Sequence, residues 1–416
     1  MAHLVVVESK PTAGFEILRA AAGLGHEVTF VAHSLGPYLR SDGAEAALAT
    51  ATRVITSVAT ADPGALFAAL EPVHRQSPVH GMTTLSEGHV RATAEVAERL
   101  GLRHERPEVT ARLRDKHEVR TLLARAGVPQ PGFAAAATAE EAVAARDGLG
   151  YPVVVKPADG FGSLGVGVAR TAAQVAELAE AITATRGYGR SVASSGAVLV
   201  ESYVQGPVVS CEMLTVDGEH RAYGCTDRVL APPPHPVELG GCFPAELEPD
   251  LLAEVERVCA AALDAVGVRR SHTHTELVLG PDGPQIIEIN GRLVGGYVPE
   301  MMNLVLGRNV YHDVVDLAVG GSPAPSAAGG VACIRAITAP RPGVLAALDV
   351  EGVRRSPGVA EVLVDTAVGQ RVGPARANGD RLGFLIAAGP SAAAVTGAAE
   401  AALARAVVRV TADAAT

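Results

Sequence analysis

The sequence predicts a mixed α/β and α+β fold, with an open parallel α/β domain at the N-terminus and a small α/β unit at the C-terminus. Its opening has the pattern of a βαβ unit, because two β-branched runs at 3–8 and 27–32 flank a helical one at 14–23. Further along, two alternating segments flank Asp217 and Gly218, a strong hairpin signal. Parallel crossovers followed by antiparallel hairpins therefore indicate several subdomains.

At 416 residues the chain is long enough for roughly two to four subdomains, each with its own core. We divide it into an N-terminal domain, two lobes of a central domain and a C-terminal unit, at residues 1–110, 111–196, 197–320 and 331–416. The polar run 186–196 is expected to form an irregular turn between the lobes. By composition, the glycine-rich stretch 320–330 is expected to be a linker.

The remaining elements follow from periodicity and from capping residues. Helices are expected at 87–100, 112–126, 172–185, 251–266 and 391–406, the last as the terminal helix of the chain. Strands are expected at 153–156, 166–169, 197–201, 208–216, 219–228, 273–279 and 285–290, with an antiparallel series beginning at 197. Thr171 is a plausible N-cap, and Gly101 a helix stop. Residues 232–241 contain four prolines and are expected to have no regular structure.

Composition excludes several functional classes. A net charge of −10 and a pI near 5.7 argue against a nucleic-acid partner, because phosphate contacts need a basic surface. No apolar run is long enough to span a membrane, and residues 1–8 lack the basic start of a signal peptide, so a cytoplasmic protein is expected. The five cysteines form no C-x-x-C pair, and this odd, dispersed set indicates reduced thiols, without a disulfide framework or a zinc site.

A glycine-rich loop follows the strand that ends at Lys156. Its glycines let backbone N–H groups close on phosphate oxygens, while the lysine supplies a positive charge. Gly160, Gly162 and Gly165 also satisfy G-x-G-x-x-G, but the alternating residues 166–169 predict a strand where a dinucleotide fingerprint requires a helix. The lysine precedes the glycines, so the Walker pattern is absent as well. We therefore expect a phosphate-binding hairpin, with a purely structural hairpin as the alternative.

Two glutamates on neighbouring strands suggest a metal site. Glu276 and Glu288 lie on strands joined by a turn at 281–283, and antiparallel pairing would bring their carboxylates to one face. Two facing carboxylates repel each other, so their pairing requires a cation between them. Alternation puts Asn290 on the same face, and these hard oxygen ligands suit magnesium bound to ATP phosphates. For either glutamate alone, the alternative is a solvated charge at a strand edge.

The residues after this strand add a cation. Arg292 can point to the same side as Asn290, where a guanidinium would bind phosphoryl oxygens or a substrate carboxylate; its alternative is a surface salt bridge. Gly295 and Gly296 suggest a close approach of the backbone. His274 and its neighbour two residues earlier could be taken for a zinc pair, but no third ligand follows at suitable spacing, so ordinary hydrogen-bonding histidines are expected.

In this order, the motifs resemble those of the ATP-grasp superfamily, and within it the carboxylate–amine ligases that include L-amino-acid ligases. The resemblance spans almost the whole chain and implies the ATP-grasp fold. It rests on Asp115-Lys116, Gly127-Val-Pro129, the Lys156 loop, Val198-Leu-Val-Glu201, His274-Thr-Glu276 and Glu288-Ile-Asn290-Gly-Arg292. It implies nucleotide binding by Lys116, Lys156, Gly160, Gly162, Ser163, Gly165, Glu201, Tyr203 and Val204. It further implies metal binding by Glu276, Glu288 and Asn290, and catalysis by Lys156 and Arg292.

Two positions depart from the family pattern. Val208 stands where many relatives carry a glutamate that binds the ribose, and Gly241 replaces the histidine of a V-E-x-G-H loop. Glu238 of this loop would still bind a substrate amino group. We therefore expect a substrate pocket that includes Glu238, Arg292, Gly295 and Gly296, with the identity of the substrate open.

The sequence as a whole predicts an ATP- and Mg²⁺-dependent ligase, with Mn²⁺ as an alternative metal. It would activate a carboxylate, expected to be that of an amino acid, as an acyl phosphate and join it to an amine, releasing ADP and phosphate. The alternatives are acyl transfer to a thiol or carrier protein, ligation of a carboxylate that is not an amino acid, and a non-catalytic nucleotide-binding protein. The expected partners are small-molecule carboxylates and amines, without nucleic acid or membrane, in a homodimer.

Overall fold

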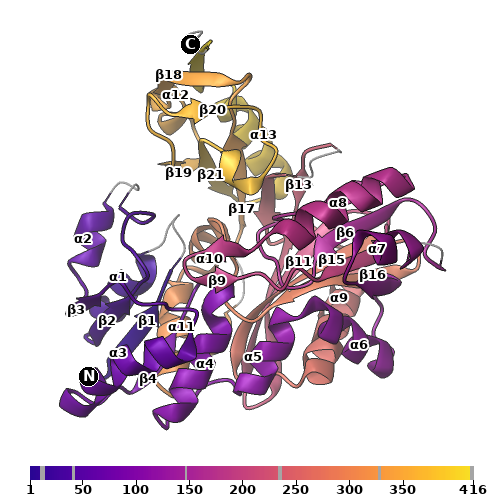
Figure 1. Ribbon diagram of the computed structural model, residues 1–416. Helices are drawn as coiled ribbons and strands as arrows, with labels where there is room; N and C mark the ends of the chain where they lie inside the picture. The colour runs from indigo at the N-terminus through magenta and orange to yellow at the C-terminus, as the bar shows by residue number, and fades with distance from the viewer. Residues whose placement is uncertain (10–14, 40–42, 146–147, 233–236, 327–328, 413–416) are drawn as a thin grey trace.

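The computed structural model describes residues 1–9, 15–39, 43–145, 148–232, 237–326 and 329–412 (Figure 1). The N-terminal domain is a four-stranded parallel sheet in the order β3-β2-β1-β4. Its strands are β1 (His3–Val7), β2 (Glu27–Val31), β3 (Arg53–Ile55) and β4 (Gly81–Thr83). Its helices are α1 (Glu16–Gly23), α2 (Ala44–Leu48), α3 (Pro63–Gln76), the 3₁₀ turn η1 (Glu87–His89) and α4 (Val90–Arg99). The predicted βαβ opening is confirmed, although residue 14 lies outside the described residues.

Two helices lead from this domain to the central one, where the sequence predicted a single helix at 112–126. They are α5 (Pro107–Arg114) and α6 (Lys116–Ala126). The single helix is wrong because Asp115 between them is extended, and its Oδ1 accepts the N–H groups of His117 and Glu118. Asp115 therefore caps α6 and puts Lys116 at its first position.

The first lobe of the central domain is an antiparallel sheet in the order β5-β10-β6-β7. Its elements are β5 (Phe133–Ala136), α7 (Ala139–Ala145), β6 (Val153–Pro157), β7 (Gly167–Ala169), α8 (Ala172–Ala184) and β10 (Val198–Ser202). The predicted hairpin around the glycine loop and the Thr171 cap of α8 are confirmed. Placing 197–201 in the later antiparallel series is wrong, because β10 pairs with β5 and β6; alternation identifies a strand but not its partner.

The polar segment 186–196 is a second correction. It forms a two-stranded hairpin of β8 (Gly187–Gly189) and β9 (Val192–Ala193), where an irregular turn was expected. Arg190 and Ser191 turn the hairpin with left-handed φ angles of 46° and 62°. Arg190 Nη1 donates 2.8 Å to Ser9 O, so the hairpin docks the first lobe on the N-terminal domain.

The second lobe is an antiparallel sheet in the order β12-β11-β15-β16. Its two predicted pairs, β11 with β12 and β15 with β16, are confirmed. Its elements are β11 (Val208–Val216), β12 (Glu219–Asp227), α9 (Pro249–Val266), β15 (Ser271–Gly280) and β16 (Gly283–Asn290). Helix α9 packs with α5 and α6 through a cluster of small aliphatic side chains that includes Val258 and Leu263.

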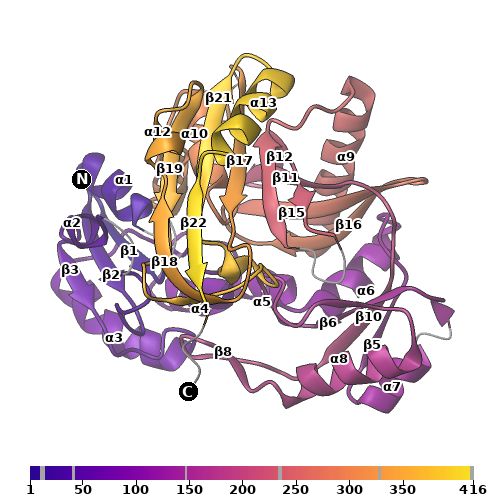
Figure 2. The same cartoon turned by 90° about the horizontal axis from the view of Figure 1, so that it is seen from above.

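The C-terminal unit forms a three-stranded sheet, β20-β18-β22, and most of a five-stranded one, β13-β14-β17-β21-β19, which β13 and β14 join from the second lobe. The strands are β13 (Val229–Leu230), β14 (Glu238–Phe243), β17 (Val331–Ile337), β18 (Gly343–Asp349), β19 (Val359–Val364), β20 (Arg371–Val372), β21 (Gly383–Gly389) and β22 (Val407–Thr411). Helices α10 (Val298–Leu306) and α11 (Val310–Ala318) precede this unit, and α11 packs against α1 and β4 of the N-terminal domain. The helices of the unit itself are α12 (Glu351–Arg354), η3 (Asn378–Asp380) and α13 (Ala392–Leu403). In Figure 1 this unit lies above the rest of the chain, and the view from above in Figure 2 places it between the N-terminal domain and the second lobe.

One sequence prediction about this region is wrong. Of 232–241, residues 233–236 lie outside the described residues, but Glu238 to Gly241 belong to β14, because the proline run ends before them. The terminal helix predicted at 391–406 is confirmed as α13, with Ser391 at its N-cap, and β22 follows it.

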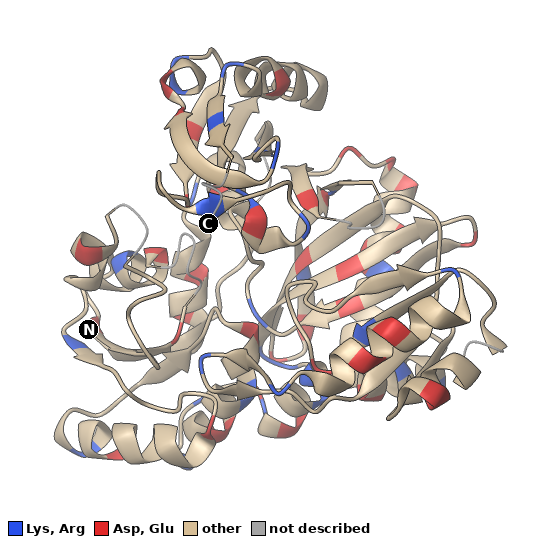
Figure 3. Cartoon of the chain, turned by 45° about the horizontal axis from the view of Figure 1, so that its top comes forward, with Lys and Arg blue, Asp and Glu red and all other residues tan. Residues whose placement is uncertain are grey.

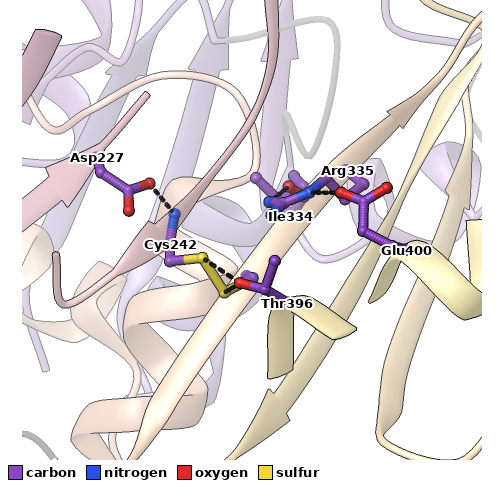
Figure 4. Close-up of a disulfide and its surroundings, with 7 residues drawn as sticks. Asp227, Cys242, Ile334, Arg335, Thr396 and Glu400 are labelled. Atoms are coloured by element: carbon purple, nitrogen blue, oxygen red, sulfur yellow. Dashed lines mark hydrogen bonds and ion pairs between the residues drawn. A yellow bond between two sulfur atoms is a disulfide. The ribbon is translucent and has the colours of Figure 1, made fainter. Parts of the chain in front are cut away.

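The cysteine prediction is also wrong for one pair. Cys242 and Cys333 are cross-strand neighbours of β14 and β17 and form a disulfide, with Cα atoms 4.0 Å apart (Figure 4). Their separation of 91 residues hides this pairing in the sequence. The other three cysteines, Cys211, Cys225 and Cys259, are free and buried.

Charge is spread over the structure. Acidic and basic residues are interspersed along the chain as drawn in Figure 3. Among the described residues, no helix combines the length and the apolar character needed to cross a membrane.

Candidate active site

The predicted metal and substrate residues come together around one cavity of about 240 Å³. Its walls are formed by β14, β15, β16, the loop after β16, the glycine loop and the C-terminal unit. Predicted site residues on these walls are Gly162, Ser163, Glu238, Glu276, Glu288, Asn290, Arg292, Gly295 and Gly296. The cavity therefore joins the loop expected to bind phosphate to the strands expected to bind metal.

The two predicted metal carboxylates are cross-strand partners. Glu276 on β15 lies opposite Glu288 on β16, and Asn290 lies opposite His274. A Mg²⁺ ion fits this donor set, because it consists of hard oxygens on one face of the sheet. In the described part of the chain, no three acidic, histidine or cysteine side chains converge in a metal-binding cluster.

A buried histidine links Glu276 to a second carboxylate, that of Glu212. His274 Nε2 is 3.2 Å from Glu276 Oε1, and its Nδ1 is 3.0 Å from Glu212 Oε2. Burial lowers the pKa of His274, but Glu212 and the hydrogen bonds outweigh it and raise this pKa to about 9. Burial raises the pKa of Glu276, but His274 and Arg228 outweigh it and lower this pKa to about 2. His274 is therefore an ion-paired support for Glu276, whereas His272 is buried next to Tyr223 with a pKa of about 3 because of desolvation.

Lys116 connects the metal strand to the glycine loop. Its Nζ lies 3.2 Å from Glu288 Oε1 and donates 2.5 Å to Gly160 O. A lysine held between a carboxylate and the glycine loop can exchange these contacts for one with a phosphate oxygen when a nucleotide is bound.

Lys156 is held by a buried carboxylate. Glu201 accepts Lys156 Nζ at 2.7 Å on Oε2 and Arg120 Nε at 2.6 Å on Oε1. Burial raises the pKa of Glu201, but the two cations outweigh it and hold this pKa at about 2. Burial lowers the pKa of Lys156, and Glu201 opposes this shift. The carboxylate thus orients the lysine. Because both of its oxygens are paired, the predicted contact with a nucleotide base would fall to the backbone after Glu201.

Four other residues predicted to bind nucleotide do not line this cavity: Gly160, Gly165, Tyr203 and Val204. Tyr203 N donates 3.2 Å to Pro152 O while its side chain is exposed, and Val204 packs close to Gly280. In the glycine loop, Gly162 and Gly165 need glycine because their φ angles are 64° and 72°. A Cβ on Gly160 would lie 3.1 Å from Pro157, so this glycine permits close packing.

Known proteins resemble the chain over most of its length. Residues 18–104 match the ATP-grasp N-terminal domain, 149–300 the ATP-grasp domain, and 335–411 the L-amino acid ligase C-terminal domain 2. The chain belongs to the ATP-grasp superfamily. Its domain content places this ATP-grasp protein in the carboxylate–amine ligase branch, as the motifs predicted.

Individual relatives agree with this placement. An uncharacterized protein, y4rH, of Sinorhizobium fredii is 29% identical over 93% of this chain and 79% of its own length. The alanine–anticapsin ligase of Bacillus subtilis is 26% identical over 59% of this chain, which spans about half (55%) of that protein. The crystal structure of an L-amino acid ligase from Bacillus licheniformis superposes with a TM-score of 0.83 over 99% of both chains at 20% identity, which shows the shared fold.

Sequence reasoning missed two arginines of the ATP-grasp cavity. Arg228 Nη1 lies 3.0 Å from Glu238 Oε1, and Arg228 Nη2 lies 3.2 Å from His274 Nε2. Arg381 of the C-terminal unit donates 3.0 Å to Glu238 O, and Asn378 Oδ1 accepts Glu238 N–H. Glu238 is therefore held between two cations. No local motif marks Arg228 or Arg381; only the pairing of β13 and β14 with the C-terminal unit brings them to the site.

Arg292 reaches the cavity and is held on its other side by the N-terminal domain. Its Nε lies 3.0 Å from Glu87 Oε2, and its Nη1 donates 2.8 Å to Leu293 O. A Cβ on Gly296 would meet no described atom within 4 Å, and this glycine has a φ of 61°. The space in front of Gly296 thus stays open to the cavity.

Proposed function

We propose that this ATP-grasp ligase uses ATP to activate the carboxylate of an amino acid as an acyl phosphate and joins it to an amine, releasing ADP and phosphate. One observation carries the proposal. The cavity brings Arg292, the Glu276–Glu288 pair and Ser163 of the glycine loop to one place. A cation for the acid, a metal site and a phosphate loop are the parts that phosphoryl transfer to a carboxylate needs.

The C-terminal unit supports an amino acid as the acid. It matches a domain of L-amino acid ligases, and the alanine–anticapsin ligase is a sequence relative. Glu238, which would face the amino group, is 28% exposed and paired with Arg228. An incoming ammonium group would thus share Glu238 with Arg228, so the substrate must present its amino group at the free edge of this carboxylate.

In the first step, a carboxylate oxygen of the acid attacks the γ-phosphorus of ATP, and the bond to the β–γ bridging oxygen breaks to release ADP. In the second step, the amine attacks the acyl carbon, loses a proton, and phosphate leaves with the former carboxylate oxygen. Lys156 and Lys116 bind phosphate oxygens, and Arg292 stabilises the negative charge of the acyl phosphate.

ATP-grasp enzymes use ATP together with a divalent metal ion. Glu276, Glu288 and Asn290 would hold it, and when bound it neutralises charge on the phosphoryl oxygens. The glycine loop would exclude water, which otherwise hydrolyses the acyl phosphate.

The test is a phosphate-release screen over pairs of amino acids with ATP and Mg²⁺, followed by mass spectrometry of the products. The proposal expects at least one pair to give stoichiometric phosphate and a condensed product lighter than the pair by one water. Glu288→Gln should lower this activity by at least about 100-fold, since removing charge neutralisation in the transition state costs several kcal/mol. Glu140→Gln, an exposed change on α7, is the charge-matched control. Full activity of Glu288→Gln, or a wild-type protein that only hydrolyses ATP, contradicts the proposal.

A further inference from the structure

The 3₁₀ turn η1 of the N-terminal domain contacts three other parts of the chain through three successive residues. A Cβ on Gly88 would lie 2.7 Å from Val192 Cγ2 and 3.3 Å from Phe161 Cε1, so the β8–β9 hairpin and the glycine loop both approach it closely. His89 Nε2 lies 3.1 Å from Arg190 O at the tip of the same hairpin. The third residue, Glu87, pairs with Arg292, whose side chain lines the cavity described above.

Glu87 is a buried carboxylate between two guanidinium groups. Its side chain is 3% exposed, with Oε2 3.0 Å from Arg292 Nε and Oε1 3.6 Å from Arg114 Nη1. Within the described residues, neither carboxylate oxygen has a hydrogen bond of regular geometry. Glu87 is therefore stabilised by charge, and a charge desolvated in this way requires its partners.

The two arginines contact different parts of the chain. Arg292 is held on one edge by Glu87 and on another by Leu293 O, and these two contacts set the plane of its guanidinium at the cavity wall. Arg114 donates through Nη2 to Asp159 O at the base of the glycine loop, and its guanidinium carbon lies 5.4 Å from the centre of the Phe161 ring. The Glu87 carboxylate thus holds both Arg292 at the cavity and Arg114 at the base of the glycine loop.

We propose that Glu87 is a positioning residue that fixes the Arg292 guanidinium for the acyl-phosphate stage and, through Arg114, anchors the glycine loop over the nucleotide. The part that concerns Arg292 rests on the proposed function. A guanidinium that is orientated before the reaction loses little entropy in the transition state, so its loss of orientation lowers kcat more than it raises KM.

The kinetic test compares Glu87→Gln, Glu87→Asp and the control Glu95→Gln, a partly exposed glutamate of α4 paired with Arg91. With the acid–amine pair found by the screen, Glu87→Gln should lower kcat by about 10- to 100-fold while each KM changes less than about threefold. Glu87→Asp, which keeps the charge, should recover part of kcat, and Glu95→Gln should match wild type. A raised KM for the amine or the acid with kcat unchanged would mean that Glu87 binds substrate, and it overturns the proposal.

A second measurement does not depend on turnover. In hydrogen–deuterium exchange without nucleotide, the peptide that covers 157–166 should exchange faster in Glu87→Gln than in wild type or Glu95→Gln, because Arg114 loses its partner. Equal exchange in all three overturns the anchoring role. If the wild type condenses no pair of substrates, the proposed function fails while this exchange result still decides the role of Glu87. If Glu87→Gln does not fold, Arg114→Gln takes its place, with the same faster exchange expected and equal exchange contradicting it.

Discussion

Lys156 and Glu201 form an ion pair in the interior of the first lobe, with Nζ 2.7 Å from Oε2 and side chains only 4% and 2% exposed. Arg120 binds the other oxygen of the same carboxylate, and its guanidinium also donates to Ile286 O and Ile287 O on β16. The triad therefore ties β6, which carries Lys156, to β16, which carries Glu288.

Glu201→Gln should destabilise the protein strongly. It leaves Arg120 and Lys156 buried without a compensating charge, and breaking such a pair costs about 3–5 kcal/mol. The free energy of unfolding from urea titration measures the effect, with Glu140→Gln as the control. A loss below about 1 kcal/mol, as for an exposed ion pair, contradicts the buried triad.

The same variant predicts a pH dependence. The pKa of Glu201 lies at about 2 in the folded protein, below its ordinary value of 4.5. Its contribution to stability is therefore fully present above the ordinary value and is lost as the pH falls through about 2. The difference in unfolding free energy between wild type and Glu201→Gln should shrink when the titration is repeated below pH 4.5. A difference that stays constant down to pH 3 would contradict the assigned shift.

The segment from Phe161 to Leu164 should close over bound nucleotide. The amides of Leu164 and Val166 make long hydrogen bonds of 3.4 Å within the loop, so their protection from exchange should be weak without ligand. A nonhydrolysable ATP analogue with Mg²⁺ should slow hydrogen exchange of this segment, while α7 stays unchanged as the internal control. Identical exchange of the loop at saturating analogue would show that it does not act as a flap.

Glu238→Ala should raise KM for the acid substrate much more than KM for ATP. The change removes the anionic partner of Arg228 and the group expected to face the substrate amino group. Steady-state kinetics with each substrate varied in turn measures both constants. Equally small effects on every substrate would mean that Glu238 only holds β14 against Arg228 and Arg381.

The Cys242–Cys333 disulfide should contribute measurably to stability. Cross-links that close a long loop typically stabilise by about 2–4 kcal/mol, and this one closes 91 residues. Wild type should have a lower melting temperature in reductant, whereas Cys333→Ser should melt at the same temperature with and without it. Five reactive thiols in the denatured, unreduced protein would show that the bond does not form.

The sequence predicts what is local. Glu276 and Glu288 are joined by a short turn, so their pairing follows from alternation alone, and the structure has it in that register. Cys333 lies 91 residues from Cys242, and Arg381 lies 143 residues from Glu238, and no periodicity reports such contacts. The break at Asp115 was equally hidden, because a capping aspartate inside a helical pattern has no apolar signature.

The charged residues near the cavity that the sequence did not predict were also hidden because their contacts are not local. Three charged side chains at or next to the cavity come from three different domains: Arg228, Arg381 and Glu87. Each resembles a surface residue when only its neighbours in sequence are considered. Their burial depends on how the domains assemble. The homodimer and the cytoplasmic location stay predictions.

The most direct measurement of the central claim follows one oxygen atom. The acid substrate is labelled with ¹⁸O in its carboxylate, and the phosphate released during turnover is examined by ³¹P NMR or mass spectrometry. Transfer of the γ-phosphoryl group to the carboxylate predicts ADP as the nucleotide product and one ¹⁸O atom in each released phosphate. Label in AMP, or unlabelled phosphate alongside a condensed product, would contradict an acyl phosphate formed in this site.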